Sequence, residues 1–293
     1  MRVLVIGWSS FQDGEATAGD VLSTEAVRDS LVEAGIAVDV AWSPGLRADG
    51  LRLAEIDPNA YTHLLFVCGP PHGRQVRQLH ERFAHCRRVA VGVSIVVPDD
   101  PAVTGFHEII ARDGAGISPQ RDLAAGPRCA LVPVVGVVLA HAQHEYGNQQ
   151  RHDDVHARLT SWLALQDCAL VLCDTRLDGR DWRFARTPDQ LESIIKRLDV
   201  VVTSRMHGLV LALKNGVPTL AVDPIAEGAK VSAQAAAWGW PAVLRADTLT
   251  PADLDHWWGW CRSTQGQAHA SRCARDASNG TLIALLLKSI TEN

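Results

Sequence analysis

The sequence lacks the features that mark membrane, secreted or nucleic-acid-binding proteins. Among its 293 residues the longest apolar run, Ala130 to Ala140, is about half of the roughly 20 residues that a membrane-spanning helix needs. The apolar start, Met1 to Gly7, is too short for a secretion signal and is typical of a strand. A net charge of -5 lacks the basic excess of a nucleic-acid or membrane-surface binder. These absences predict a soluble, cytoplasmic protein that binds no nucleic acid.

Paired cysteines and cofactor fingerprints are absent as well. The seven cysteines form no Cys-x-x-Cys pair, so their spacing fits neither a disulfide framework nor a zinc site and predicts free thiols. The glycines Gly7, Gly14 and Gly19 do not match the Gly-x-Gly-x-x-Gly fingerprint of dinucleotide-binding folds. We therefore expect no metal and no cofactor. The sequence carries no signal for a particular oligomeric state.

Short apolar, β-branched runs alternate with longer amphipathic segments along the chain. The expected strands are Val3–Gly7, Ala37–Ala41, His63–Val67, Val89–Ser94, Val135–Ala140, Ala169–Cys173, Val200–Thr203 and Thr219–Asp223. The expected helices are Val21–Ala34, Arg74–Cys86, Asp154–Leu165, Pro188–Lys196 and Met206–Lys214. Because the apolar strands are continuous rather than alternating, they indicate sheets covered on both faces, which is parallel α/β architecture.

The number of strand–helix units is too large for one compact sheet. We expect two Rossmann-like α/β domains facing a cleft, residues 1–126 and 127–293, with the boundary at the Gly126-Pro127 turn. The tail from Thr281 to Ser289 predicts a short apolar helix that could pack back on the first domain.

The segment from Asp199 to Lys230 has the pattern of an anion-binding strand–turn–helix. Its strand ends at Ser204-Arg205-Met206-His207-Gly208, and the helix that follows is closed by Asn215-Gly216. In open α/β sheets ligands bind outside the carboxyl ends of the strands, where Arg205 and His207 fall. A helix N-terminus and an arginine fork both suit a phosphate or a carboxylate. The alternative is structural: Arg205 pairs with Asp223 or Asp199, and His207 bonds a neighbouring carbonyl.

Several motifs resemble those of the polysaccharide pyruvyl transferases. Ser204–Gly208, followed by Gly216-Val217-Pro218, Asp223 and Lys230, is similar to the C-terminal signature of that family. Two weaker motifs occur in the same order as in the family. These are Gly19-Asp20 ahead of a helix, and Ile109-Ile110-Ala111-Arg112-Asp113 near the end of the first domain.

The resemblance implies a fold like that of the GT-B glycosyltransferases, with phosphoenolpyruvate as the small-molecule donor and a sugar-containing acceptor. It implies transfer of the pyruvyl group onto two sugar hydroxyls, with release of phosphate. The enol carbon must be protonated, and His207 is the candidate general acid. Arg205, Lys230 and Arg112 are candidate cations for the donor's phosphate and carboxylate. Asp20, from the opposite domain, is the candidate base.

Departures from the family pattern concentrate in the first domain, which the resemblance assigns to the acceptor. Ala16-Thr17-Ala18 lacks the asparagine that the family usually has there. After the third strand, where the family has a glycine-rich turn, this chain has Cys68-Gly69-Pro70-Pro71. In the second domain, the strand Val135–Ala140 ends in His141–Gly147, where members of the family often carry an arginine on the strand's end. Gln143, Glu145 and Tyr146 are candidates for a polar set that contacts the substrate, and a solvated loop is the alternative. Arg176 follows a strand and is either a further anion contact or a surface ion pair.

The region from Trp238 to Trp260 holds five of the nine tryptophans. Stacking on a sugar is one interpretation. The spacing of Trp257, Trp258 and Trp260 near Leu254 favours an amphipathic helix that packs against the domain.

Two other functions fit the same fold. A GT-B-type glycosyltransferase would need contacts to the ribose and base of a nucleotide sugar, and Glu227 beside Gly228 is the only hint of these. A non-catalytic relative that binds a glycan would have no need of a proton donor between cations. An enzyme is therefore favoured, because the chain retains Arg205, His207, Lys230 and Asp20 together.

Overall fold

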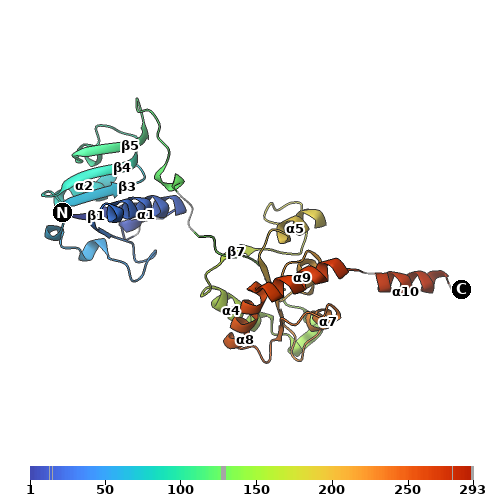
Figure 1. Ribbon diagram of the computed structural model, residues 1–293. Coiled ribbons are helices and arrows are strands. Elements are labelled where there is room, and N and C mark those ends of the chain that lie inside the picture. The colour runs from blue at the N-terminus through green and yellow to red at the C-terminus, as the bar shows by residue number, and fades with distance from the viewer. Residues whose placement is uncertain (13, 15, 127–129, 279, 292–293) are drawn as a thin grey trace. The chain divides into compact units, whose positions relative to one another are not determined.

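The computed structural model describes residues 1–12, 14, 16–126, 130–278 and 280–291. The chain divides into two compact units, Met1–Cys129 and Ala130–Asn293, each with one five-stranded sheet (Figure 1). Every strand pair is parallel, so two parallel α/β domains are confirmed. Part of the expected boundary, Pro127, lies outside the described residues. The expected cleft between the domains stays a prediction.

The first sheet has the strand order β2-β1-β3-β4-β5. Its strands are β1 Arg2–Ile6, β2 Ala37–Val40, β3 His63–Val67, β4 Arg87–Ile95 and β5 Glu108–Gly114, and its helices are α1 Ala18–Glu33, α2 Gly73–Arg82 and α3 Pro101–Thr104. Alternate residues of a strand face opposite sides of a sheet. Val3 and Val5 accordingly pack with α1, whereas Leu4 and Ile6 pack with α2, so the two helices cover opposite faces.

In such a doubly wound sheet the usual ligand site lies where the winding reverses, here between the carboxyl ends of β1 and β3. In the first unit this point holds the indole of Trp8, whose Nε1 donates to the carbonyl of Pro70 at 3.2 Å. A Cβ at Gly69 would lie 2.6 Å from the Trp8 ring, and Gly69 has a φ of +68°. The Cys68–Pro71 turn, which departs from the family pattern, therefore packs closely against this tryptophan.

The second sheet has the order β10-β9-β8-β6-β7, which is the same winding as the first. Its strands are β6 Val134–Val138, β7 Ala169–Leu172, β8 Val200–Thr203, β9 Thr219–Asp223 and β10 Val243–Arg245. Its helices are α4 His152–Leu163, α5 Pro188–Ile195, α6 Met206–Lys214, α7 Lys230–Ala237, α8 Pro251–Arg262, α9 Thr264–Asp276 and α10 Gly280–Thr291. The tail thus forms the expected helix, and its packing on the first domain stays a prediction.

The tryptophan-rich region supplies core residues of the second unit. Trp258 lies on α8, is 6% exposed and meets the ring of Trp162 edge to face at 5.8 Å. Trp240 is 2% exposed and donates its indole N–H to the carbonyl of Thr219 at 2.7 Å. Packing within the domain, rather than sugar stacking, is therefore confirmed for these two residues. No helix in the described part of the chain has both the length and the apolar character to span a membrane.

Candidate active site

A cavity of about 340 Å³ lies at the carboxyl ends of β6, β8 and β9. It falls where the winding of the second sheet reverses, between β6 and β8, which is the usual ligand position in this architecture. The polar residues that line it are Gln143, Ser204, Arg205, His207, Asp223, Lys230 and His141. Four of these seven were predicted site residues, so the structure brings together His207, Arg205, Lys230 and Gln143.

Two buried hydroxyl groups tie the ends of β6 and β8 beneath this cavity. Thr203 donates its hydroxyl to the carbonyl of Val138 at 2.7 Å, and its oxygen accepts the Arg205 N–H at 2.9 Å. The Ser204 oxygen accepts the N–H of Ala140 at 2.9 Å. Both side chains are almost fully buried, so these bonds fix the backbone from which Arg205 and α6 begin.

The close approach of α6 to the strand ends requires glycine at position 208. A Cβ at Gly208 would lie 2.3 Å from the Thr203 hydroxyl oxygen and 3.0 Å from a methyl of Val138. Both neighbours belong to the sheet, so the helix would have to move. This contact explains the glycine that ends the Ser204–Gly208 motif.

We expect Gly208→Ala to lower the free energy of unfolding by about 1–3 kcal/mol, because the added methyl overpacks this contact. Urea denaturation would measure the change. The matched control is Gly259→Ala on α8, where a Cβ meets nothing within 4 Å and a gain of about 0.5–1 kcal/mol is expected. Equal effects of the two substitutions would contradict the packing argument.

Arg205 is the N-cap residue of α6 and one of the cations of the cavity. Its Nη1 lies 2.7 Å from Oδ1 of Asp174, which follows β7. The alternative of a pair with Asp223 or Asp199 is therefore wrong: Asp199 instead accepts the N–H of Val134 at 2.7 Å. One edge of the guanidinium is held by Asp174, and this orients the group toward the cavity that it lines.

Asp223 organises the loop that carries Lys230. The Asp223 side chain is fully buried, and its carboxylate accepts hydrogen bonds from the N–H groups of Ile225, Ala229 and Ser232 at 3.1, 2.7 and 2.8 Å. These bonds fold the chain back on the end of β9 and start α7 at Lys230. Asp223 is thus a positioning residue for the second cation of the cavity.

Among the residues that the structure describes, the ammonium group of Lys230 has only weak partners. It lies 3.9 Å from the carboxylate of Glu145, which is 63% exposed, and 5.6 Å from the ring centroid of Tyr146. An exposed ion pair of this length contributes about 0–1 kcal/mol. An anionic ligand in the cavity can therefore recruit Lys230 at little cost.

His207 lies in the first turn of α6, is exposed, and lines the cavity beside Arg205. His141, which follows β6, lines the same cavity. The site thus combines two imidazole groups, two cations and the positive end of a helix dipole. This arrangement can bind a small dianion and deliver a proton to it.

Two further histidines lie behind the site on α4. His156 Nε2 is 3.5 Å from the hydroxyl oxygen of Ser204, and burial lowers the pKa of this ring. His152 is 2% exposed, and neither of its ring nitrogens has a hydrogen-bond partner within the described residues. Burial lowers the pKa of His152 as well, so its ring is held neutral.

The buried His152 predicts a loss of stability in mild acid. The unfolded chain binds a proton at this ring near the ordinary histidine pKa of about 6.5, whereas the folded chain binds it only at lower pH. The contribution of His152 to the free energy of unfolding is therefore fully present above about pH 6.5 and is lost as the pH falls below this value. In urea denaturation from about pH 7.5 to 5.5, His152→Leu is expected to lose less stability than the parent protein. An unchanged pH dependence would exclude this origin.

Two other predicted contacts have different environments. The backbone N–H of Gln143 is held by the side chain of Gln150 at 3.1 Å, and Gln143 lines the cavity. The guanidinium of Arg176 lies over the ring of Phe184, 4.4 Å from its centroid, and Arg176 is not among the residues that line the cavity. Its backbone N–H donates to Asp174, so this turn supports the partner of Arg205.

Arg112 and Asp20, both in the first unit, make internal bonds. Arg112 donates to Ser94 at 2.6 Å and to Asp113 at 2.7 Å and pairs with Asp122, and the bonds to the carboxylates of Asp113 and Asp122 raise its pKa. Asp20 is the third residue of α1, and its Oδ2 accepts from the N–H and hydroxyl of Thr17 at 2.9 and 2.8 Å. Both side chains thus stabilise the first domain, and their roles toward substrate stay predictions.

The fold and the site together define an α/β protein with a pocket at the switch point of its second sheet, lined by the cations Arg205 and Lys230. Residues 136–224 match the model of the family described as polysaccharide pyruvyl transferase. The resemblance inferred from the sequence is thereby confirmed for this stretch, which includes Gln143, Arg205 and His207. A search of curated proteins finds no significant match.

Several solved structures align with most of the chain at low sequence identity. The rhamnosyltransferase SpnG of spinosyn, in complex with thymidine diphosphate, is 12% identical, with a TM-score of 0.35 and coverage of 94% of this chain and 95% of that one. MurG of Acinetobacter baumannii is 12% identical, with a TM-score of 0.36 and coverage of 98% and 100%. The heptosyltransferase WaaC of E. coli with ADP is 14% identical, with a TM-score of 0.29 and coverage of 89% and 100%. At these low scores the matches carry no argument about activity.

Proposed function

We propose that the protein is a phosphoenolpyruvate-dependent pyruvyl transferase that forms a ketal on a pair of sugar hydroxyls. The observation that carries the proposal is the joint position of Arg205, His207 and Lys230 in one cavity, within or beside the stretch that matches the family. The donor is a small dianion, and the acceptor is a sugar in a glycan or in a glycosylated metabolite. The reaction needs no cofactor.

The cavity suits the two anionic groups of phosphoenolpyruvate. Arg205, held on one edge by Asp174, presents its remaining donors as a fork that matches a phosphate or a carboxylate. Lys230 supplies a mobile point charge for the other group, since its own partners are weak. The N-terminus of α6 adds a positive dipole end beside both cations.

In the proposed reaction, His207 protonates the methylene carbon of phosphoenolpyruvate, which becomes a methyl group. The carbon that carries the phosphate becomes electrophilic, and the first sugar hydroxyl attacks it and gives up its proton to a base. The second hydroxyl then displaces phosphate from the same carbon and closes the ketal. One hydroxyl proton restores His207, and the other leaves with the phosphate.

Asp20 is the proposed base that accepts the proton of the attacking hydroxyl. The family resemblance implies Asp20, whose two hydrogen bonds from Thr17 both end on Oδ2, so the base role would fall to Oδ1. The bond from the Thr17 N–H, together with the Asp20 N–H that donates to the Thr17 hydroxyl oxygen at 3.2 Å, forms the capping box of α1. The carboxylate therefore has a structural role whether or not it also accepts a proton.

Ligand binding and phosphate release test the proposal. Isothermal titration calorimetry should detect phosphoenolpyruvate and no nucleotide sugar, and phosphate should be released only when phosphoenolpyruvate and a suitable sugar acceptor are both present. Binding of a nucleotide sugar without phosphoenolpyruvate would favour a glycosyltransferase. Binding of glycans with no turnover of either donor would favour a non-catalytic relative.

A further inference from the structure

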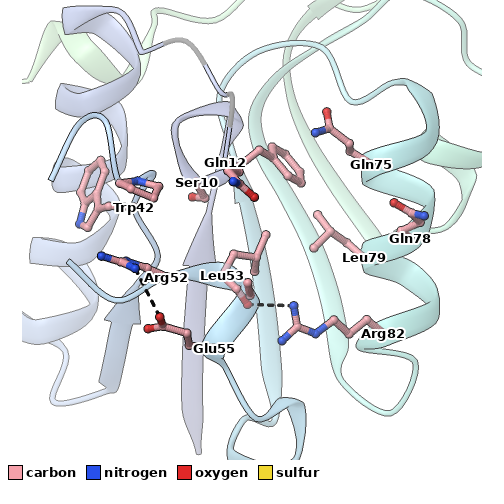
Figure 2. A pocket seen from close by; sticks show the side chains of 13 residues that line it. Ser10, Gln12, Trp42, Arg52, Leu53, Glu55, Gln75, Gln78, Leu79 and Arg82 are labelled. Carbon is pink, nitrogen blue, oxygen red and sulfur yellow. Dashed lines mark hydrogen bonds and ion pairs between the residues drawn. The ribbon is translucent and has the colours of Figure 1, made fainter. Parts of the chain in front are cut away.

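The first unit contains a second cavity, of about 480 Å³, on the face of the sheet that α2 covers (Figure 2). Small-molecule sites typically have volumes of roughly 300–1,000 Å³. In a doubly wound sheet a helix usually connects β2 to β3 across this face. Here the connection contains only two short 3₁₀ turns, Leu53–Glu55 and Pro58–Ala60. The cavity lies in the space between this connection and α2.

The floor and one wall of the cavity are apolar and fixed. Phe11 and Leu79 are 7% and 4% exposed, and Trp42 is 5% exposed. The Arg47 guanidinium lies over the Trp42 ring, 4.3 Å from its centroid, and the backbone N–H of Trp42 donates to the carbonyl of Leu51 at 2.8 Å. An indole packed under this cation on a fixed backbone is a rigid surface for the apolar face of a ligand.

The uncharged polar residues of the lining are three glutamines and Ser10, whose hydroxyl already donates to the carbonyl of Ala41 at 2.6 Å. Gln75 and Gln78 lie three residues apart on α2, so they share the helix face that lines the cavity, and Gln12 comes from the loop after β1. Figure 2 shows Gln12 between Trp42 and the α2 side chains. Each amide both donates and accepts hydrogen bonds, which is the chemistry that recognises hydroxyl groups.

The charged groups of this cavity have partners within the protein. Arg82 donates to the backbone carbonyls of Leu53, at 2.8 Å, and Ile56, and thereby fastens the connection to α2. Arg52 lies 3.6 Å from the exposed carboxylate of Glu55, which is a weak ion pair. A ligand with a phosphate group would have to compete with Glu55 for Arg52 and with two backbone carbonyls for Arg82.

We propose that this cavity binds an uncharged glycoside, whose sugar hydroxyls meet Gln12, Gln75 and Gln78 and whose apolar face or aglycone lies against Trp42. The assignment of this glycoside as the acceptor rests on the proposed pyruvyl transfer. Its binding does not, because none of the residues involved belongs to the donor site. The cavity thus narrows the acceptor to a neutral glycoside, not a sugar phosphate or a nucleotide sugar.

Calorimetry on the full chain tests the proposal with a panel of 4-nitrophenyl hexopyranosides, the free hexoses and the hexose 1-phosphates. The parent protein is expected to prefer a nitrophenyl glycoside. Gln75→Ala with Gln78→Ala is expected to weaken that binding about 10-fold, because two hydrogen bonds are lost. Ala54→Trp, at an exposed position of the lining, is expected to block the cavity and abolish binding. The matched control is Arg77→Ala, exposed on α2 but outside the lining, which should bind like the parent.

Three outcomes would overturn the inference: no binding of any glycoside at millimolar concentration, unchanged binding in both cavity variants, or a preference for hexose 1-phosphates. Phosphoenolpyruvate titrations on the same samples keep the two proposals separate. If the cavity variants lose glycoside binding and the parent fails to bind phosphoenolpyruvate, the donor assignment fails and the glycoside site stands. If phosphoenolpyruvate binds equally to all variants, the loss of glycoside binding is local to the first unit.

Discussion

His207→Gln is expected to reduce turnover by about 10²–10⁴-fold, the contribution typical of a general acid. Glutamine keeps a hydrogen-bonding group in the first turn of α6, but it cannot deliver a proton to carbon. Since His207 is exposed, the substitution should leave the fold intact. Phosphate release with a competent acceptor measures the rate. Calorimetry with phosphoenolpyruvate should still show binding close to that of the parent, because Arg205 and Lys230 remain.

His141 provides the decisive comparison, since it lines the same cavity from the end of β6. His141→Gln is expected to retain most of the turnover. If that variant loses turnover and His207→Gln does not, the proton donor is His141 and the mechanism is otherwise unchanged. If both variants remain fully active, neither imidazole is the general acid.

The strand–turn–helix from Asp199 to Lys230 could be predicted because its signals are local. The apolar strand, the Asn215-Gly216 helix end and the Pro218 that precedes the next strand all act over a few residues. The expected bounds of β8, α6 and β9 agree with the structure for the same reason. Parallel topology then requires that strand ends, and the residues after them, share one edge of the sheet.

Contacts between distant segments could not be predicted in this way. Asp174 pairs with Arg205, 31 residues away, because β6 lies between β7 and β8 and brings the two strand ends to one edge. From the sequence, the candidate partners of Arg205 are Asp223 and Asp199, which lie nearer to it along the chain than Asp174. His152 and His156 gave no signal, since a histidine on an amphipathic helix has the same pattern whether it faces solvent or a buried site.

Polar residues in weak motifs are the hardest to interpret from sequence. Arg112 and Asp20 fit the family's order, yet each makes bonds within the first domain that any stable fold could use. The same limit applies to β5, Glu108–Gly114, which contains the Ile109–Asp113 motif and is not among the strands expected from the sequence. The short strand β10, Val243–Arg245, was not expected because three residues provide too little periodicity.

Asp223→Asn is expected to lower the free energy of unfolding by about 3 kcal/mol. This is the free energy expected when hydrogen bonds from backbone N–H groups to a buried charged acceptor are lost. One carboxylate oxygen accepts from both Ala229 and Ser232, and the other accepts from Ile225. An asparagine amide has only one acceptor oxygen. Its NH₂ group takes the place of the other oxygen and faces backbone N–H donors, which it cannot accept from. Urea denaturation measures the loss. Asp247→Asn, whose partner Arg245 is 3.8 Å away near the surface, should change stability by less than about 0.5 kcal/mol.

The same substitution should weaken phosphoenolpyruvate binding by at least about 10-fold, because the loop that starts α7 no longer fixes Lys230 and a charge-assisted contact is lost. Lys230→Met separates the two effects. It should reproduce the loss of binding with the stability of the parent, since the Lys230 ammonium has only weak partners. An Asp223→Asn variant as stable as the parent would show that the three hydrogen bonds accepted by Asp223 do not stabilise the fold. An unstable variant that binds phosphoenolpyruvate like the parent would show that Lys230 reaches the donor without the help of Asp223.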